Sequence, residues 1–466
     1  MGASISASAE PALAGGPAGA ARVRALADAA MTAMADTAAT RQGPVPGGGP
    51  AAVAAVLAAA LGEPGLLPER GVGERRALDE LTRVLTAGSV DPGHPWCAAH
   101  LHGPILAVAA AADLVGSVLN PSMDSWDQAP IASELERELT ATLARLCFPD
   151  AVTPDAVLTS GGTESNLVGL LLAREHGHTR IVCGANAHHS VARAAWLLGL
   201  PAPRVVPAER GRLRADALDL SGGEVVVATA GTTDAGTIDP LPEIARAARR
   251  AGAWLHVDAS YGGAALFSRR LAGRLAGLAQ ADSVALDLHK FGWQPIAAGV
   301  LATRETITAL HVRADYLNAG DDTEAGLPDL LGRSIRTSRR PDCVKIAVTL
   351  RALGRAGIAG LVERCCDLAR EVAREAGRHP DLELWGEPAL STVLVRPRHG
   401  DAAGHAAAIR RRLLEDGTAV VGRATVDGAV WLKLTLLNPR ATVDDYRGLL
   451  DLVGNLADET ARRAMP

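Results

Sequence analysis

Lysine is the scarcest reactive residue type in this chain. Of the 47 Lys and Arg residues among 466, only Lys290, Lys345 and Lys433 are lysines. Arginine cannot replace lysine where a deprotonated amine is required, so amine chemistry has few candidates. Lys290 follows His289 just after an apolar run, which places it at the end of a buried strand. We expect Lys345 and Lys433 to be surface charges on a helix and on a strand.

A carboxylate ends another apolar run. Asp258 follows Trp254–Val257 and precedes Lys290 by 32 positions. Ligands bind at the carboxyl ends of strands in parallel α/β sheets, so Asp258 and Lys290 are expected at one edge of a sheet. For Asp258 taken alone, the alternative is a helix-capping carboxylate.

A glycine-rich turn lies earlier in the chain. Residues 159–166 read Thr-Ser-Gly-Gly-Thr-Glu-Ser-Asn, between an apolar run and a helical segment. Glycines permit close backbone approach, and the N–H groups at a helix N-terminus bind anions. The turn is neither GxGxxG nor GxxxxGK[ST], which weighs against dinucleotide and P-loop sites. An ordinary helix start is the alternative for this turn alone.

The three features together suit pyridoxal phosphate. This cofactor needs a phosphate cradle, a carboxylate at its pyridine nitrogen, a ring-stacking group and a lysine. The turn, Asp258 and Lys290 supply three of these, and the pair His188-His189 can supply the fourth. Zinc is a rival ligand for the histidines. We expect no metal, because neither paired thiolates nor a His-Glu-x-x-His helix accompanies them.

These residues need a scaffold, and the hydrophobic pattern predicts an α/β fold. Apolar strand-like runs alternate with helix-length segments, which favours a mostly parallel sheet flanked by helices. The expected strands are Ala156–Thr159, Arg180–Cys183, Glu224–Ala230, Trp254–Val257, Ser283–Leu286 and Gly299–Thr303. The expected helices between them include Ser165–Glu175, Ser190–Leu198 and Pro242–Ala251.

The ends of the chain differ from this central part. Residues 1–20 are Ala-, Gly- and Ser-rich, and we expect a disordered tail. Residues 21–90 form an N-terminal segment with helices over 22–40 and 51–62, which bury too little alone and are expected to pack on a partner subunit. The cofactor-binding domain spans 91–345. Residues 346–466 are predicted to be a smaller α+β domain, entered through the long helix Lys345–Arg378.

Composition excludes several other functions. A net charge of −5 weighs against a nucleic-acid partner, which needs a basic face. No apolar run is long enough for a membrane span, and the N-terminus lacks the basic start of a secretory signal. Six cysteines without CxxC spacing suit a reducing compartment, so we expect a cytoplasmic protein.

The chain resembles a known family. From about Gly43 to Val453 it is similar to the group II pyridoxal-phosphate-dependent amino-acid decarboxylases of fold type I, most of all to diaminobutyrate-decarboxylase-like members. The matching segments, in order, are His94–Trp96, Asn120–Pro130, Thr159–Asn166, Ala187-His188, Ala230–Thr233, His256–Ala259, Asp287–Lys290, Gln294–Ile296, Asp315–Asn318 and Thr337–Arg340.

The resemblance implies a fold and a set of roles. The fold would be that of the pyridoxal-phosphate-dependent transferases, with a seven-stranded sheet. Lys290 would hold the cofactor as a Schiff base, Asp258 would pair with the pyridine nitrogen, and His188 would stack on the ring. The remaining implied cofactor contacts are Gly162, Thr163, Thr233, Ser260, Asp287 and His289, with Thr337 and Ser338 from the second subunit of a homodimer. His100 and His102 would line the substrate pocket.

The implied reaction is decarboxylation of an L-amino acid to an amine, with an aliphatic or basic substrate favoured. Branched, acidic and aromatic substrates stay open. Several members of the family protonate the substrate through a tyrosine on a mobile loop, but residues 319–336 contain neither Tyr nor Phe. Tyr316 and His188 are the alternative donors. The other functions considered are aldehyde-forming oxidative decarboxylation, carbon–carbon lysis, transamination, and cofactor binding without turnover.

Overall fold

A seven-stranded sheet forms the centre of the molecule in a computed structural model that describes residues 13–63, 65–399 and 401–464. The strand order is β1-β9-β8-β7-β6-β2-β3, and only β9 runs antiparallel to its neighbours. The strands are β1 (Asp155–Thr159), β2 (Arg180–Gly184), β3 (Arg204–Val206), β6 (Glu224–Thr229), β7 (Trp254–Ala259), β8 (Ser283–Asp287) and β9 (Gly299–Thr303). A short hairpin, β4 (Ala208–Glu209) and β5 (Arg212–Leu213), lies beside them.

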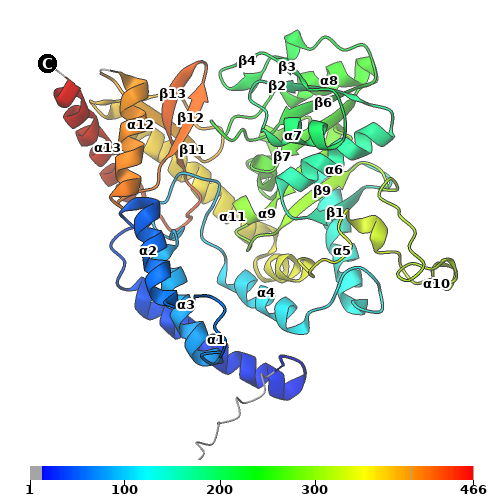
Figure 1. Ribbon diagram of the computed structural model, residues 1–466. Helices are drawn as coiled ribbons and strands as arrows, with labels where there is room; N and C mark the ends of the chain where they lie inside the picture. Colours follow the sequence, from blue (N-terminus) through cyan, green and yellow to red (C-terminus); the bar gives the residue numbers. More distant parts are fainter. Residues whose placement is uncertain (1–12, 64, 400, 465–466) are drawn as a thin grey trace, which may run out of the picture.

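Helices cover both faces of this sheet, as Figure 1 shows. Helices α6 (Gly162–Glu175) and α7 (Ser190–Leu197) pack on one face through a cluster with β2 and β6. The other face is covered by α5 (Pro130–Cys147), α8 (Leu241–Ala251) and part of α11 (Cys343–Arg378). Burial on both faces explains why the central strands are continuously apolar rather than alternating.

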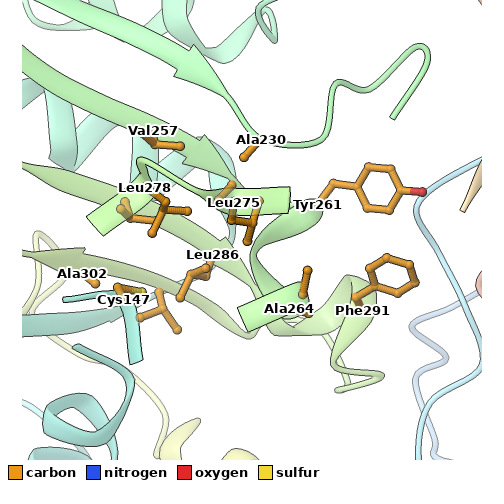
Figure 2. Close-up of a cluster of buried hydrophobic side chains, with 14 of the residues drawn as sticks. Cys147, Ala230, Val257, Tyr261, Ala264, Leu275, Leu278, Leu286, Phe291 and Ala302 are labelled. Carbon is orange, nitrogen blue, oxygen red and sulfur yellow. The ribbon is translucent and has the colours of Figure 1, made fainter. Parts of the chain in front are cut away.

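The largest hydrophobic cluster lies directly under the strand ends that carry polar residues. Figure 2 shows Val257 of β7 and Leu286 of β8 packed with Leu275 and Leu278. At the border of the cluster the rings of Tyr261 and Phe291 lie 5.3 Å apart between centroids. The segments that follow β7 and β8 are therefore anchored by apolar packing within a few residues of Asp258 and Lys290.

A second, four-stranded sheet forms the C-terminal part, with strand order β10-β11-β13-β12 and antiparallel pairing throughout. Its strands are β10 (Leu382–Leu384), β11 (Thr392–Pro397), β12 (Gly422–Val426) and β13 (Ala429–Thr435). Helices α11, α12 (Ala402–Glu415) and α13 (Val443–Ala464) pack against it. Helix α11 is kinked at Gly354, whose φ of 61° lies outside the helical region.

The first three helices lie apart from both sheets (Figure 1). They are α1 (Gly16–Ala38), α2 (Gly49–Leu61) and α3 (Glu74–Gly88), and they pack mainly on one another. Helix α2 has no buried residue, and the exposed apolar side chains on it include Val56 (50% exposed) and Leu57 (45%). Helix α4 (Ala107–Leu119) follows and carries exposed Val115 and Leu119. None of the helices in the described part of the chain is long and apolar enough to cross a membrane.

The predicted α/β architecture and the six predicted strands are confirmed, with boundaries that differ by at most two residues. Two expectations need revision. Helix α1 already begins at Gly16, inside the segment 1–20 expected to be disordered, while residues 1–12 lie outside the described residues. Lys345 and Lys433 are not surface charges: they are 1% and 6% exposed. Lys345 pairs with Asp342 at 2.9 Å, and this ion pair compensates its burial.

Candidate active site

A cavity of about 480 Å³ opens where β1, β6, β7 and β8 end. Strands β6, β7 and β8 run in parallel, so their carboxyl ends meet at this edge. The cavity is lined by Leu101, Ser160, Gly161, Gly162, Thr163, Asn166, His188, His189, Thr229, Gly231, Thr233, Asp258, Ser260, Tyr261, Asp287, His289, Lys290 and Ile296. Nine of the residues predicted from the sequence are among them.

Lys290 lies in the short helix α9 (Leu288–Phe291), which starts immediately after β8. Its Nζ is 2.8 Å from Oδ2 of Asp287, the last residue of β8, and its side chain is 20% exposed. His289 lies between them in the chain, with Nε2 3.6 Å from the same oxygen. The strand end thus holds the lysine at the cavity wall while leaving its amine accessible.

Asp258 is 6% exposed near the end of β7. Its Oδ2 accepts a hydrogen bond from Asn166 Nδ2 at 2.9 Å, and its Oδ1 accepts one from the backbone N–H of Ser260 at 3.1 Å. Burial opposes ionisation, but the charge of Lys290 and these hydrogen bonds outweigh it and hold the pKa of Asp258 below its usual value. The site therefore keeps a buried, ionised carboxylate.

His188 lies in the turn before α7, and its ring is next to that of His189, with centroids 4.0 Å apart. Its Nδ1 is 2.8 Å from the hydroxyl of Ser190. Burial lowers the pKa of His188 below its usual value, with the charge of Asp258 acting in the opposite direction. The imidazole that lines the cavity is thus neutral at pH 7.

The glycine turn brings the backbone of α6 close to the cavity. A Cβ on Gly162 would clash with Ser260 Oγ, and a Cβ on Gly161 would lie 3.0 Å from the His289 ring. Only glycine leaves the N–H groups at the start of α6 open to a ligand. Ser260 Oγ and His289 Nδ1 are buried without a hydrogen-bond partner among the described residues, as expected of groups that await a polar ligand. These features fit pyridoxal phosphate.

Thr233 lines the cavity from the loop after β6. Its backbone carbonyl accepts a hydrogen bond from Lys433 Nζ at 3.0 Å, so β13 of the C-terminal sheet holds this loop. Burial lowers the pKa of Lys433, and the nearby Asp234 partly opposes that shift. The role of Lys433 as an interdomain contact was not expected from the sequence.

Five predicted residues are not on the cavity wall of this chain. His100 and His102 are exposed, and it is Leu101 between them that lines the cavity. Thr337 and Ser338 are exposed. Tyr316 is 81% exposed and does not line the cavity.

Sequence reasoning missed several lining residues. Asn166 is part of the glycine-turn motif but has no role assigned from the sequence, and Tyr261 is not among the residues predicted from it. The Tyr261 hydroxyl lies 2.9 Å from Ser391 Oγ in the C-terminal part, so it joins the two domains beside the cavity. The signal that could have found Asn166 is its place one turn into a helix that starts at an anion-binding turn. Among residues 13–63, 65–399 and 401–464, no three His, Cys, Asp or Glu side chains are placed to hold a metal ion.

The fold and the cavity define a class of protein: a pyridoxal-phosphate-dependent enzyme of fold type I, with a lysine, a buried carboxylate and a glycine turn at one sheet edge. Residues 64–397 match the family described as the pyridoxal-dependent decarboxylase conserved domain. The chain belongs to this family. It is a carboxy-lyase that acts on an amino acid, with pyridoxal phosphate as its cofactor.

Individual relatives agree with this. An L-2,4-diaminobutyrate decarboxylase of Rhizobium meliloti (strain 1021) is 40% identical over 421 residues, covering 84% of each chain. One from Acinetobacter baumannii is 33% identical over 427 residues, 82% of this chain and 84% of the relative. The crystal structure of the glutamate decarboxylase domain of diaminobutyrate-pyruvate transaminase and L-2,4-diaminobutyrate decarboxylase from Vibrio parahaemolyticus superposes with a TM-score of 0.83 at 29% identity, covering 96% and 98% of the chains.

Proposed function

We propose that this enzyme converts L-2,4-diaminobutyrate to 1,3-diaminopropane and carbon dioxide. The observation that carries the proposal is the 40% identity, over most of both chains, to a decarboxylase of that substrate. The described cavity is compatible with a short substrate, because about 480 Å³ must hold both the cofactor and the amino acid. The aliphatic or basic preference expected from the sequence motifs points the same way.

Lys290 and Asp258 have the central roles in the proposed mechanism. Lys290 would supply the amine that holds the cofactor covalently. Asp258, ionised and buried, would keep a proton on the pyridine nitrogen. Bound pyridoxal phosphate supplies an electron sink that stabilises the negative charge left at Cα when the carboxylate departs.

The remaining cavity residues bind and orient. We assign phosphate binding to the N–H groups at Gly162 and Thr163 and to His289, because they surround the start of α6. Asp287 and Ser260 lie beside Gly162 at the start of α6, and Asp287 also holds the amine of Lys290. His188 would stack on the ring of the cofactor, and Thr233 would lie near its phenolic side.

A homodimer with shared sites is part of the proposal. Thr337 and Ser338 reach the phosphate of the second subunit, and His100 and His102 lie on the segment that lines the substrate pocket. The exposed apolar side chains of α2 and α4 support a buried interface in the dimer. In this arrangement residues 21–90 pack on the partner, 91–345 bind the cofactor and 346–466 form the small domain. All six cysteines are free thiols, which supports a cytoplasmic location.

The shared site can be tested by mixing two inactive variants, Lys290→Ala and Thr337→Glu. In a mixed dimer, one site carries both changes and the other carries none. Random reassociation should therefore restore about a quarter of the wild-type activity. Two variants whose mixture stays inactive, although mixed dimers form, would show that each site is built from one chain.

The proton donor decides whether the product is an amine. Residues 319–336, which include α10 (Gly320–Glu324), contain no Tyr or Phe, and Tyr316 is exposed. We assign protonation of Cα to His188, which lines the cavity. The missing loop phenol is also the one observation that favours aldehyde-forming oxidative decarboxylation as a second candidate. Equal amounts of carbon dioxide and amine, without hydrogen peroxide, would exclude that candidate.

The substrate is tested by kcat/KM for a panel of L-amino acids with the purified, cofactor-loaded enzyme. The panel contains 2,4-diaminobutyrate, ornithine, glutamate, leucine and tryptophan. The proposal requires the highest kcat/KM for 2,4-diaminobutyrate, by at least about tenfold over ornithine, because a misplaced distal amine loses a charged hydrogen bond. A higher value for glutamate or tryptophan would reassign the substrate class while leaving the reaction unchanged.

A further inference from the structure

A buried hydrogen-bond network lies behind the cavity and has Asn166 at its centre. Asn166 Nδ2 donates to Asp258 Oδ2 at 2.9 Å and to Ser190 Oγ at 2.8 Å. Asn166 Oδ1 is 2.9 Å from His256 Nε2. Asn166, Ser190 and His256 are each 0% exposed, so water cannot exchange for any of these partners.

The direction of each hydrogen bond follows from the chemistry of the groups. An ionised carboxylate only accepts, so the side of Asn166 that faces Asp258 must be its NH₂ group. The amide oxygen then faces His256, and His256 Nε2 must carry a proton to donate to it. Burial lowers the pKa of His256 to about 4, so at neutral pH its ring holds one proton only. That proton is on Nε2.

The far side of His256 is consistent with this assignment. With its proton on Nε2, His256 Nδ1 must accept, and Ser283 Oγ lies 2.8 Å from it. Trp254 Nε1 donates to the same hydroxyl at 3.2 Å, which leaves the hydroxyl hydrogen of Ser283 for His256. Each donor in this branch therefore meets an acceptor.

The second branch runs to the other side of the cavity. Ser190 Oγ accepts from Asn166, which leaves its own hydrogen available for His188 Nδ1, 2.8 Å away. The backbone N–H of Ser190 also donates to this nitrogen, at 3.3 Å. A backbone N–H can only donate, so Nδ1 of His188 accepts and carries no proton, and the neutral ring then holds its proton on Nε2.

We propose that Asn166 is a positioning residue that controls two sides of the site at once: it orients the carboxylate of Asp258 and, through Ser190, fixes His188 as the tautomer protonated on Nε2. One amide thereby couples the group at the pyridine nitrogen to the group that stacks on the ring. The two tautomers do not depend on which substrate the enzyme uses. The effect of Asn166 on catalysis rests on the roles proposed above for Asp258 and His188.

The experiment uses the cofactor-free full-length protein, labelled with [¹⁵N]histidine. Long-range ¹H–¹⁵N spectra distinguish the two tautomers, and His188→Gln and His256→Gln assign the signals. Both wild-type rings should be protonated on Nε2. In Asn166→Asp the acceptor for His256 remains, the donor to Ser190 is lost, and the new carboxylate shares a proton with the neighbouring Asp258. His256 should keep its proton on Nε2, while His188 should lose its single tautomer and pyridoxal phosphate should bind roughly ten- to a hundredfold more weakly.

Ser165→Ala is the matched control. Ser165 is the preceding residue of α6, is also 0% exposed, and its hydroxyl lies 2.7 Å from Thr159 Oγ1, away from the network. This variant should keep both wild-type tautomers and bind the cofactor as the wild type does. If the tautomer of His188 changes in both variants, then any disturbance of α6 alters that tautomer, and the proposal would be wrong.

Two other results overturn the inference. His188 of the wild type protonated on Nδ1 contradicts the direction of the network, even if no Asn166 variant folds. An Asn166→Asp protein with an unchanged His188 tautomer and unchanged cofactor affinity removes the role of Asn166. A failure of the proposed function appears differently, as correct tautomers in a protein that decarboxylates no amino acid.

Discussion

Replacing Asp258 by Asn tests the electrostatics of the site most sharply. The substitution keeps the shape of the side chain, and Asn166 can still donate to its remaining oxygen, so the fold should persist. It removes the charge that holds a proton on the pyridine nitrogen. Breaking a buried ion pair by removing one partner costs about 3–5 kcal/mol. With Asp258 only 6% exposed, little solvent screening reduces this figure. At about 1.36 kcal/mol per factor of ten, kcat should fall roughly a hundred- to several-thousandfold.

The assay measures carbon dioxide release at saturating substrate and cofactor, together with thermal unfolding of the cofactor-free protein. Asp282→Asn is the matched control, because Asp282 is a partly buried carboxylate immediately before β8, at the opposite end of that strand from the cavity, where it accepts a hydrogen bond from the backbone of Leu255. The control should keep kcat within a few-fold. An Asp258→Asn enzyme that binds cofactor and retains kcat within about threefold would refute the proposed role of this carboxylate.

Three further predictions concern single residues. Reduction of the cofactor-loaded protein with borohydride should attach the cofactor to the peptide containing Lys290 and, in Lys290→Ala, to no other lysine peptide by mass spectrometry. Tyr316→Phe should leave kcat unchanged, since Tyr316 is 81% exposed and outside the cavity; a tenfold loss would make it the donor, acting from a rearranged loop or the second subunit. The buried Glu224 has its pKa held at about 2, because hydrogen bonds from Arg180 and Ser221 outweigh the effect of burial. Its stabilising contribution is therefore present above the unfolded pKa of about 4.5 and is lost as the pH falls towards 2. The melting temperature of Glu224→Gln should lie below that of the wild type at pH 7, and the difference should shrink at pH 3; an equal difference at both values would contradict this.

The sequence predicts those parts of the fold in which burial restricts the residues to apolar types. The strands of the central sheet are buried on both faces and read as apolar runs, so β6, β7 and β8 were found with accurate boundaries. The sequence did not predict the edge strand β3 or the strand β12, in which buried and exposed residues alternate. Strand β12 alternates buried and exposed residues over Gly422–Val426, and its short, polar pattern is typical of a loop until its partner β13 is known.

The site was predictable where chemistry restricts residue type. Lys290, Asp258 and the glycine turn stood out because few residues could replace them. The residues that orient them did not stand out, since Asn166 and Ser190 are ordinary polar residues until the fold brings them together. Lys345 and Lys433 show the same limit. A lysine is expected at the surface unless a carboxylate or carbonyl from a distant segment, such as Asp113 or Thr233, compensates its burial.

This chain decarboxylates an amino acid, and we propose that Lys290 holds its cofactor. The most direct measurement is the stoichiometry of carbon dioxide and 1,3-diaminopropane released from L-2,4-diaminobutyrate by the cofactor-loaded wild type and by Lys290→Ala. We predict equal amounts of the two products from the wild type and neither from the variant. Full activity in Lys290→Ala would contradict the role of Lys290, and a wild-type protein that releases no carbon dioxide from any L-amino acid would contradict the reaction.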